Sequence, residues 1–443
     1  MFDLKFIREH EKEIKDSMTR RDQEINVLKN VLEKDKRYRE LKEEVDSLRH
    51  ERNVISERIN EAKKKNQDVK PIIEKARKIP EQLASIEKEL KQLEEELIIL
   101  VTKIPNVLDK NVPKGKGPSE NKVLRKWGKI PKFGFKIKTH VEIAESLGLA
   151  DFDASAETSG KGFYYLKGDL ALLNQALLRF AIDFMNSKKY EYIEPPLMIK
   201  KEVVVAAGDM NAFKDGLYKI EGEELYMIPT AEHALLGMLR DKTIPEDKLP
   251  LKLFGYSMSF RKEIGAHGIN EKGLWRTHQF NKVEQFVFCK PKDSEKYYNE
   301  LLANTEEMMK KLQLPYRVSE MCTGDLSIWK MKSADIEVYR PTLKDYGETM
   351  SVSNCGAYQS MNLKIKGIDK NGEKYFLYTL NNTAIATSRI MVAILENNQQ
   401  KDGTVKVPLA LQKYIGKKIL GIVKKVKTKK NIPKKKTKGK KKR

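Results

Sequence analysis

Several patterns that commonly hold nucleotides or metals are missing from this chain of 443 residues. There is no GxxxxGK(S/T) loop, no complete GxGxxG and no HExxH, and the six histidines show no metal-ligand spacing. A bound nucleotide would therefore have to be held by side chains on strands, because the sequence offers no glycine-rich cradle for its phosphates.

Cysteines and long apolar runs are also scarce. The three cysteines, Cys289, Cys322 and Cys355, are widely spaced, which argues against a disulfide framework or paired zinc sites and favours a reducing compartment. A lone cysteine such as Cys355 more often packs than reacts. The longest glycine-free apolar run, Ile390–Leu395, is too short to cross a bilayer, and MFDLKFIREHEK lacks the apolar core of a secretory signal. We expect a cytoplasmic protein without membrane contact.

Acidic residues are absent from residues 417–443. The whole chain has 86 Lys+Arg against 63 Asp+Glu, a net charge of +23, and this segment supplies +15 of it with 14 Lys and one Arg. Such a segment buries too little apolar surface to order itself and attracts phosphate backbones, so we expect a disordered tail that contacts nucleic acid. A solubilising or targeting tail without a role in the chemistry is an equal alternative.

Glycine is absent from residues 26–103, which are dense in Glu and Lys and carry two heptad stripes. The stripes consist of Leu41, Val45, Leu48, Ile55, Ile59 and Ala62, and of Ala76, Ile79, Leu83, Ile86, Leu90, Leu93, Leu97 and Leu100. NQDVKP, residues 66–71, ends the first helix and lets the chain reverse, while Pro80 kinks the second helix or marks its regular start. The pattern predicts an antiparallel hairpin about 50 Å long. A coiled coil for dimerisation is the alternative.

The composition after the hairpin predicts three further parts. The hairpin belongs to a coiled-coil domain of residues 1–104. After it, the Pro/Gly/Lys-rich residues 105–138 should form a linker and residues 139–416 should form the body, which the tail follows. The body is expected to be α+β. Residues 169–187 predict a buried helix that is apolar nearly all round, and YEYIEPPLMI predicts a strand at an edge or interface, ending at its proline pair.

The stretch FRKEIGAHGINEKGLWRTHQFNKVEQFVF, residues 260–288, places charges of both signs among apolar residues. It predicts a strand, a loop with three glycines and a second strand from Leu274 on, whose alternate side chains share one face. Phe280 and Glu284 would lie about 13 Å apart on that face. This separation suits an aromatic shelf for a base and a carboxylate for an ammonium or hydroxyl, with Arg261 reaching a phosphate between them. An amphipathic strand with a solvated charged face is the alternative.

The same stretch resembles motif 2 of the class II aminoacyl-tRNA synthetases, and GLWRTHQFNKVE is similar to the wording of the seryl-tRNA synthetases among them. Other landmarks of that family follow in order: IPTAEH, CTGDLS, ADIEVYRP, ETMSVSNC and the motif 3 run beginning TLNNTAIATSR. The hairpin and the IPN and VP segments also match, so the likeness covers residues 1–416. It implies an antiparallel catalytic sheet flanked by helices.

The resemblance implies roles residue by residue. The groups implied to act in catalysis are Arg261, Glu348 and Arg389, with Glu348 and Ser351 holding Mg²⁺. Those implied to bind serine are Thr230, Ala231, Glu232, Arg261, Glu284, Asn381 and Thr383. Those implied to bind ATP are Arg261, Lys262, Glu263, Thr277, His278, Gln279, Phe280, Glu348, Thr349, Met350, Ser351 and Arg389, with Phe280 and Arg389 on the two adenine faces.

The implied activity is that of an ATP-dependent ligase, which activates L-serine and transfers it to tRNA(Ser); whether tRNA(Sec) is also charged is open. The family is a homodimer whose hairpin grips the long variable arm of the tRNA. Basic residues on the hairpin, candidates for phosphate contacts, are Arg37, Arg39, Lys42, Arg49, Arg52 and Lys63–Lys65. Competing interpretations are a non-catalytic tRNA-binding scaffold and an enzyme that activates another amino acid or loads a carrier protein.

Three departures from the family pattern stand near the implied site. SNCGAYQSMN lacks the arginines of the common SNCTDFQARR and keeps Gln359. Thr383 stands where many members have serine, and ATSR replaces the bacterial AVGR, which resembles archaeal and eukaryotic members. These differences bear on the fine geometry of the site.

Overall fold

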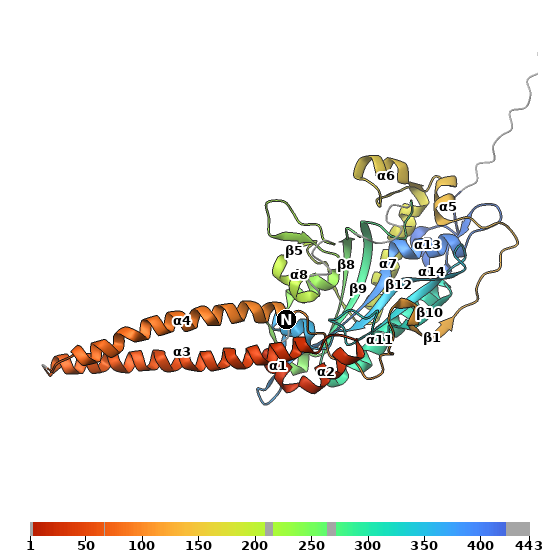
Figure 1. The fold of residues 1–443 in the computed structure, drawn as a ribbon. Coiled ribbons are helices and arrows are strands. Elements are labelled where there is room, and N and C mark those ends of the chain that lie inside the picture. Colours follow the sequence, from red (N-terminus) through yellow and green to blue (C-terminus); the bar gives the residue numbers. More distant parts are fainter. Residues whose placement is uncertain (1–2, 66, 209–215, 264–271, 422–443) are drawn as a thin grey trace, which may run out of the picture.

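The computed structural model describes residues 3–65, 67–208, 216–263 and 272–421. Figure 1 shows a long helical arm that projects from a body built on one large sheet. The predicted tail is outside the described residues from residue 422 on, and so is most of the loop between the two predicted strands, residues 264–271. No helix in the described ranges is long and apolar enough to cross a membrane.

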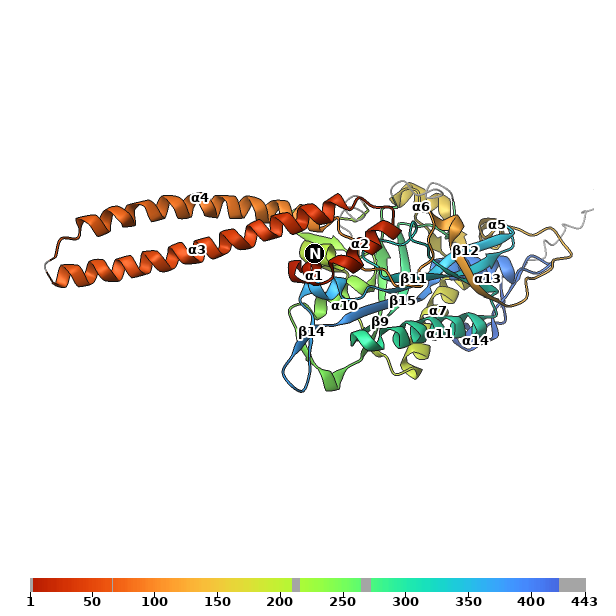
Figure 2. The same ribbon diagram turned by 60° about the horizontal axis from the view of Figure 1, so that its bottom comes forward.

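The arm is the predicted antiparallel hairpin. It consists of α3 (Asn26–Lys64) and α4 (Lys70–Val101), which lie side by side in both views (Figures 1 and 2). Val45 and Ile55 of one stripe are buried against Ile79 and Leu83 of the other, so each stripe has its partner within the chain. Pro80 lies inside α4, and the alternative that it marks the start of that helix is wrong.

Two short helices before the arm fix its base, and the heptad pattern did not predict them. α1 (Leu4–Glu9) and α2 (Glu11–Arg20) contribute to an apolar cluster shared by the hairpin and the body. From the body the cluster takes residues around α12 (Tyr358–Leu363). The arm is therefore anchored to the body through this small apolar cluster, which is separate from the main core.

The body contains an eight-stranded sheet in which neighbours are antiparallel, except that its edge strand β4 runs parallel to β8. In spatial order the strands are β1 (Lys122–Trp127), β10 (Tyr316–Glu320), β11 (Lys332–Arg340), β12 (Asp345–Asn354), β15 (Tyr378–Ala386), β9 (Gln279–Cys289), β8 (Leu251–Phe260) and β4 (Glu191–Ile193).

Helices cover one face of this sheet. They are α7 (Gly168–Ser187), α11 (Ser294–Leu312), α13 (Thr387–Asn397) and α14 (Leu409–Ile415). Val283 and Val287 of β9 point into this core, so the alternate residues Lys282 and Glu284 face the other way. The α+β prediction is confirmed, and the predicted helix over residues 169–187 is the buried α7.

Smaller elements surround the sheet. The helices are α5 (His140–Ser146), α6 (Phe152–Ser159), α8 (Lys201–Ala207) and α10 (Ala231–Met238). The short strands are β2 (Ala150–Asp151), β3 (Tyr165–Leu166), β5 (Met198–Lys200), β6 (Leu225–Met227), β7 (Thr243–Pro245), β13 (Lys366–Ile368), β14 (Lys374–Phe376), β16 (Val405–Lys406) and β17 (Ile419–Leu420).

Two sequence expectations need correction, and a third, the edge strand that ends at the proline pair, is confirmed for its first half only. Residues 105–138 are more than a linker, because Lys122–Trp127 is the edge strand β1 of the large sheet. The second strand of the motif 2 hairpin begins at Gln279, five residues later than expected, since residues 272–278 form bends. YEYIEPPLMI divides into β4, at the predicted edge of the large sheet, and β5, which pairs with β6 in another sheet.

Asp35 gives a test of the arm base. Its carboxylate, 2% exposed, accepts hydrogen bonds from Arg8 Nη1 at 2.8 Å and from Arg39 Nε at 3.1 Å. We predict that Asp35→Asn lowers the free energy of unfolding by about 1–3 kcal/mol, because the charged hydrogen bonds weaken and Arg8 loses its counter-ion. Urea unfolding measures the loss. Asp46→Asn, on the exposed face of α3, is the control, and an equal effect of both changes would contradict the assignment.

Candidate active site

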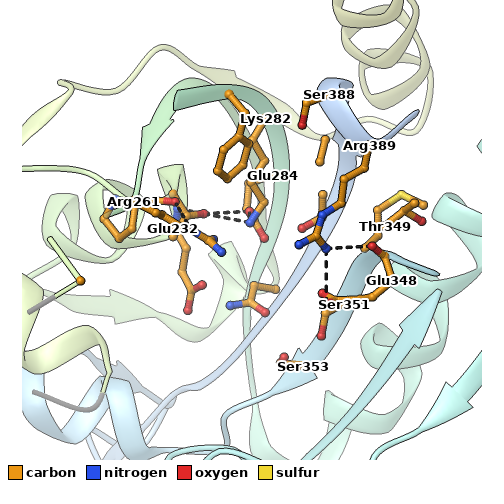
Figure 3. A pocket seen from close by; sticks show the side chains of 18 of the residues that line it. Glu232, Arg261, Lys282, Glu284, Glu348, Thr349, Ser351, Ser353, Ser388 and Arg389 are labelled. Atoms are coloured by element: carbon orange, nitrogen blue, oxygen red, sulfur yellow. Dashed lines mark hydrogen bonds and ion pairs between the residues drawn. The ribbon is translucent and has the colours of Figure 1, made fainter. Parts of the chain in front are cut away.

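A cavity of about 630 Å³ opens on the sheet face opposite the covering helices. Strands β9, β12 and β15 form its floor, and Figure 3 shows charged side chains of both signs pointing into it. The predicted site residues that line it are Thr230, Glu232, Arg261, Glu263, Thr277, Phe280, Glu284, Glu348, Thr349, Met350, Ser351, Asn381, Thr383 and Arg389. The fold therefore brings most of the predicted site residues together in one cavity.

One end of the cavity is built around Glu284. Its carboxylate accepts a hydrogen bond from Thr230 Oγ1 at 2.9 Å and pairs with Lys282, whose Nζ also lies 3.1 Å from Thr230 Oγ1. Burial raises the pKa of Glu284, and the Lys282 ammonium opposes that shift. Thr383 of β15 stands opposite Glu284 in the strand register. A carboxylate, a hydroxyl and an ammonium thus meet at a buried polar end.

Gln359 supports a second carboxylate at the same end. Its Nε2 donates to Glu232 Oε1 and to the Ala207 carbonyl, both at 2.7 Å, while its Oε1 accepts from Thr379 Oγ1 at 2.6 Å. Thr230 caps α10, so Glu232 lies in the first turn of that helix. The glutamine that remains in SNCGAYQSMN therefore orients Glu232.

The other end pairs Arg389 with Glu348. Arg389 lies in the first turn of α13, and its Nη1 donates to the Glu348 carbonyl at 2.8 Å and lies 3.3 Å from the Glu348 carboxylate. Burial would raise the pKa of Glu348, but the charges of Arg389, Arg261 and Lys330 lower it below its ordinary value. Glu348 is therefore an anion in a strongly positive surrounding.

A β-bulge explains why Glu348 and Ser351 both reach the cavity. Regular alternation would put residues three apart on opposite faces, and Met350 and Val352 do point into the helical core. The β11–β12 register shifts between Ile336 and Glu337, which adds one residue to β12 after Glu348. The irregularity turns the Glu348 side chain to the Ser351 face.

The Trp275 ring packs against two arginine side chains, those of Arg340 and Arg389. The indole lies 4.2 Å from the Arg340 guanidinium and 5.5 Å from that of Arg389, measured to the ring centroid. Arg340 forms a buried ion pair with Glu396 at 2.8 Å, and a Cβ at Gly347 would lie 2.4 Å from the indole. Only a glycine at residue 347 leaves room for this ring.

Four predicted site residues do not line the cavity. They are Ala231, Lys262, His278 and Gln279. Gln279 alternates with Phe280 and so faces away. His278 Nδ1 lies 3.0 Å from the Arg261 carbonyl, and the Lys262 ammonium lies over the Tyr218 ring. Their contacts are with the protein rather than with the cavity.

Several lining residues had no predicted role. Lys282 shares its strand face with Phe280 and Glu284, so alternation could have identified it. Trp275, Trp329 and Lys330 come from irregular segments, where no periodic signal exists. Cys355 is buried, and burial raises the pKa of its thiol, which agrees with the packing role expected of it.

The donor set suits Mg²⁺ better than a metal that needs a complete protein cage. No group of three or more His, Cys, Asp or Glu side chains with metal-binding geometry occurs within the described ranges. Mg²⁺ is commonly held by one or two carboxylates together with water and substrate phosphates. Glu348 and Ser351, on one face beside the cavity, fit that requirement.

Family models match two parts of the chain. Residues 217–398 match the tRNA synthetase class II core domain (G, H, P, S and T). Residues 1–108 match the seryl-tRNA synthetase N-terminal domain. The class of protein is therefore that of a class II aminoacyl-tRNA synthetase core joined to a helical arm.

Relatives over the full length narrow the assignment. A serine–tRNA ligase of Methanoregula boonei is 42% identical and aligns over 94% of this chain and 99% of its own, and that of Pyrococcus abyssi is 40% identical over 96% and 99%. The seryl-tRNA synthetase of Pyrococcus horikoshii complexed with ATP superposes with a TM-score of 0.89 at 38% identity, covering 96% of this chain and 100% of that one. The chain belongs to the seryl-tRNA synthetase family, which confirms the resemblance seen in its motifs.

The Arg340–Glu396 pair predicts a pH dependence of stability. Burial alone would raise the pKa of Glu396, but hydrogen bonds from His140 and Arg340 hold it at about 2. Because the folded pKa is depressed, the ionised carboxylate stabilises the protein above about pH 4.5, and this contribution is lost as the pH falls towards 2. At about 1.4 kcal/mol per pKa unit the contribution is about 3 kcal/mol.

We predict that Glu396→Gln is less stable than the unchanged protein by about 3 kcal/mol at pH 7, and that this difference narrows below pH 4.5. Urea unfolding at a series of pH values measures it. Glu373→Gln, at an exposed turn, should change stability by less than about 0.5 kcal/mol. A difference between Glu396→Gln and the unchanged protein that does not vary with pH would count against the ion-pair account.

Proposed function

We propose that this chain activates L-serine with ATP to seryl-adenylate and transfers the seryl group to the 3′ end of tRNA(Ser). The observation that carries the proposal is the two-ended cavity. An aromatic and arginine end suits a nucleotide, and a buried end of carboxylates, hydroxyls and an amide suits a small amino acid with an ammonium and a hydroxyl.

At the nucleotide end, Phe280 and Arg389 would take the two faces of the adenine, and Glu263 its edge. Arg261 would bind the α-phosphate and the serine carboxylate, since its guanidinium lies 5.3 Å from the Phe280 ring centroid and makes no ion pair within the described residues. Glu348 and Ser351 would hold Mg²⁺, which supplies positive charge to phosphate oxygens when bound. Thr277 and Thr349 complete this end of the wall.

At the amino-acid end, Glu284 and Glu232 would take the serine ammonium, while Thr230, Asn381 and Thr383 would close around its hydroxyl. A buried site that hydrogen-bonds a hydroxyl disfavours alanine, because its own polar groups would be left unpaired. The methyl of Thr383 narrows this end, which disfavours the extra methyl of threonine as substrate.

The chemistry requires no general base in the first step, because the serine carboxylate is already the nucleophile. The carboxylate oxygen bonds to the α-phosphate as the bond to the β-phosphate breaks and pyrophosphate leaves. Arg261 would neutralise charge on the reacting phosphate, and the rate would come from in-line positioning of carboxylate and α-phosphate. The 3′-terminal ribose hydroxyl of the tRNA then attacks the acyl carbon of the adenylate, so that the ester forms as the acyl–phosphate bond breaks, AMP leaves and the hydroxyl proton is released.

The arm would bind the tRNA by shape and phosphate contacts. Arg37 and Arg49 already pair with Glu89 and Glu87 across the hairpin, so Lys63–Lys65 at the arm tip are stronger candidates for phosphate contacts. We also propose a cytoplasmic homodimer, with the basic segment beyond Gly416 adding affinity for RNA. The enzyme would also charge tRNA(Sec) if the part of that tRNA that contacts the arm has the same shape as in tRNA(Ser).

Serine-dependent ATP–pyrophosphate exchange tests the activation step. We expect exchange with serine and much less with alanine or threonine. Arg261→Ala should lower the exchange rate by roughly 10²–10³-fold, because a charged contact made in the transition state is lost. Arg240→Ala, on the surface, is the control. Absence of exchange with every amino acid would favour the scaffold alternative, and exchange with another amino acid alone would contradict serine specificity.

Shortening the arm tests its role. Residues 46–85 would be replaced by a short Gly–Ser turn, which keeps α1, α2 and the apolar cluster at the base. We expect the exchange rate to change less than about twofold while charging of tRNA(Ser) falls by at least about 100-fold, since the phosphate contacts are lost. Intact charging by the shortened protein would show that the arm does not grip the tRNA.

A further inference from the structure

The loop from Leu326 to Met331 forms part of the cavity wall, and its carbonyl groups are held largely by residues from outside the body. It connects the CTGD segment to β11, and its residues Trp329 and Lys330 line the cavity together with Met321. The loop is irregular, so its carbonyls need partners from elsewhere in the protein.

Each of these carbonyls has a partner in the N-terminal region, and the Ser327 carbonyl also accepts from the Lys330 N–H within the loop. Arg21, which follows α2, donates through Nη1 to the Leu326 carbonyl at 2.6 Å and through Nη2 to the Ser327 and Lys330 carbonyls at 3.3 and 2.9 Å. Asn106 donates to the Ile328 carbonyl at 2.6 Å through its backbone and to the Trp329 carbonyl at 2.9 Å through Nδ2. The Asp109 N–H donates to the Met331 carbonyl at 3.0 Å. Six consecutive carbonyls are thus held from outside the body.

Holding the loop in this way costs free energy, because it buries the charged side chain of Arg21. Its guanidinium is largely buried, and no acid of the described residues pairs with it; burial lowers its pKa to about 10, so it remains a cation at neutral pH. A buried charge that only carbonyl dipoles neutralise is expensive. Arg20 next to it contacts the Asp109 and Val112 carbonyls instead, so the two arginines have separate targets.

Lys330 and Arg261 differ from the other cations that line the cavity, because neither makes an ion pair within the described residues. Arg276 pairs with Glu263, Lys282 with Glu284, and Arg389 with Glu348. Within the described ranges, Lys330 has no acid partner: its Nζ lies 3.5 Å from Ser333 Oγ, which in turn lies 3.2 Å from Ser351 Oγ. A cation that makes no direct ion pair in a substrate cavity is available to bind an anion.

We propose that Lys330 binds phosphate oxygens of the nucleotide, and that Arg21 and Asn106 are positioning residues that hold it in the cavity wall. This proposal rests on the proposed function. The nucleotide is favoured over the terminal phosphates of the RNA because Lys330 stands on the Ser333–Ser351 side, next to the Ser351 and Glu348 pair that would hold Mg²⁺. The nucleotide site is then completed by the N-terminal region and is not contained within the class II core.

Exchange kinetics without tRNA test the binding role. We expect Lys330→Met to raise the KM for ATP about 10-fold or more, as for loss of one charged hydrogen bond, with the KM for serine unchanged. Lys330→Arg should restore most of the loss. If the KM for ATP is unchanged and only the KM for tRNA rises in charging, the RNA takes this cation and the nucleotide assignment is wrong.

Arg21→Gln tests the positioning role, with Arg20→Gln as the matched control. We expect Arg21→Gln to raise the KM for ATP in the same direction as Lys330→Met, and Arg20→Gln to leave it within about twofold. In the double variant Arg21→Gln/Lys330→Met the two effects should not add, because Arg21 acts through Lys330. Additive effects, or equal effects of the two arginine changes, would overturn the positioning role.

Two checks keep the outcomes distinct. Circular dichroism and thermal melting confirm that each variant is folded, and Arg21→Lys, which keeps the charge but not the fork of donors, replaces Arg21→Gln if that variant unfolds. Failure of the unchanged protein to catalyse serine-dependent exchange would reject the proposed function itself. Normal exchange together with a normal KM for ATP in Lys330→Met rejects only the present proposal.

Discussion

The alternation of side chains across the large sheet is the constraint on which the rest of the molecule depends. Each strand under the cavity must bury apolar residues against the helices on one side and present charged residues on the other. β9 shows this most clearly, with Val283 and Val287 in the core and Lys282 and Glu284 in the cavity. A shift of one residue would exchange the two sets and remove both the core and the site.

The charges of the cavity are arranged before any substrate arrives. Most of its acids and bases already pair with one another, which limits the cost of holding ions in a partly buried space. The pairs also fix side-chain directions, as Gln359 does for Glu232. A site prepared in this way needs little reorganisation during the reaction, and such preorganised polar groups account for much of enzymatic rate enhancement.

The sequence predicted features that follow a period. The heptad stripes predicted the arm, because their apolar residues repeat every three or four positions along each helix. The alternation of side chains along a strand placed Phe280 and Glu284 in one cavity. It did not predict β1, whose side chains are all exposed and whose lysine-rich surroundings are typical of a linker. Nor could it show the bulge beside Glu348 or the packing of arginines on Trp275, which join residues from distant elements. The place of Lys330 depends on donors more than 200 residues away in sequence.

Because α3 is a long and stiff helix, a small change in its angle at the base of the arm moves the tip by a large distance. A helix of 39 residues is about 60 Å long, and residues 26–103 contain no glycine that would soften it. By simple trigonometry on that length, a tilt of about 5° at the base moves the tip by about 5 Å, which is close to the spacing of neighbouring phosphates. The angular tolerance of the whole arm is therefore set where α1 and α2 pack against it, far from the surface that would meet the RNA. Small changes in that base can alter which tRNA outlines fit without changing any contact residue at the tip.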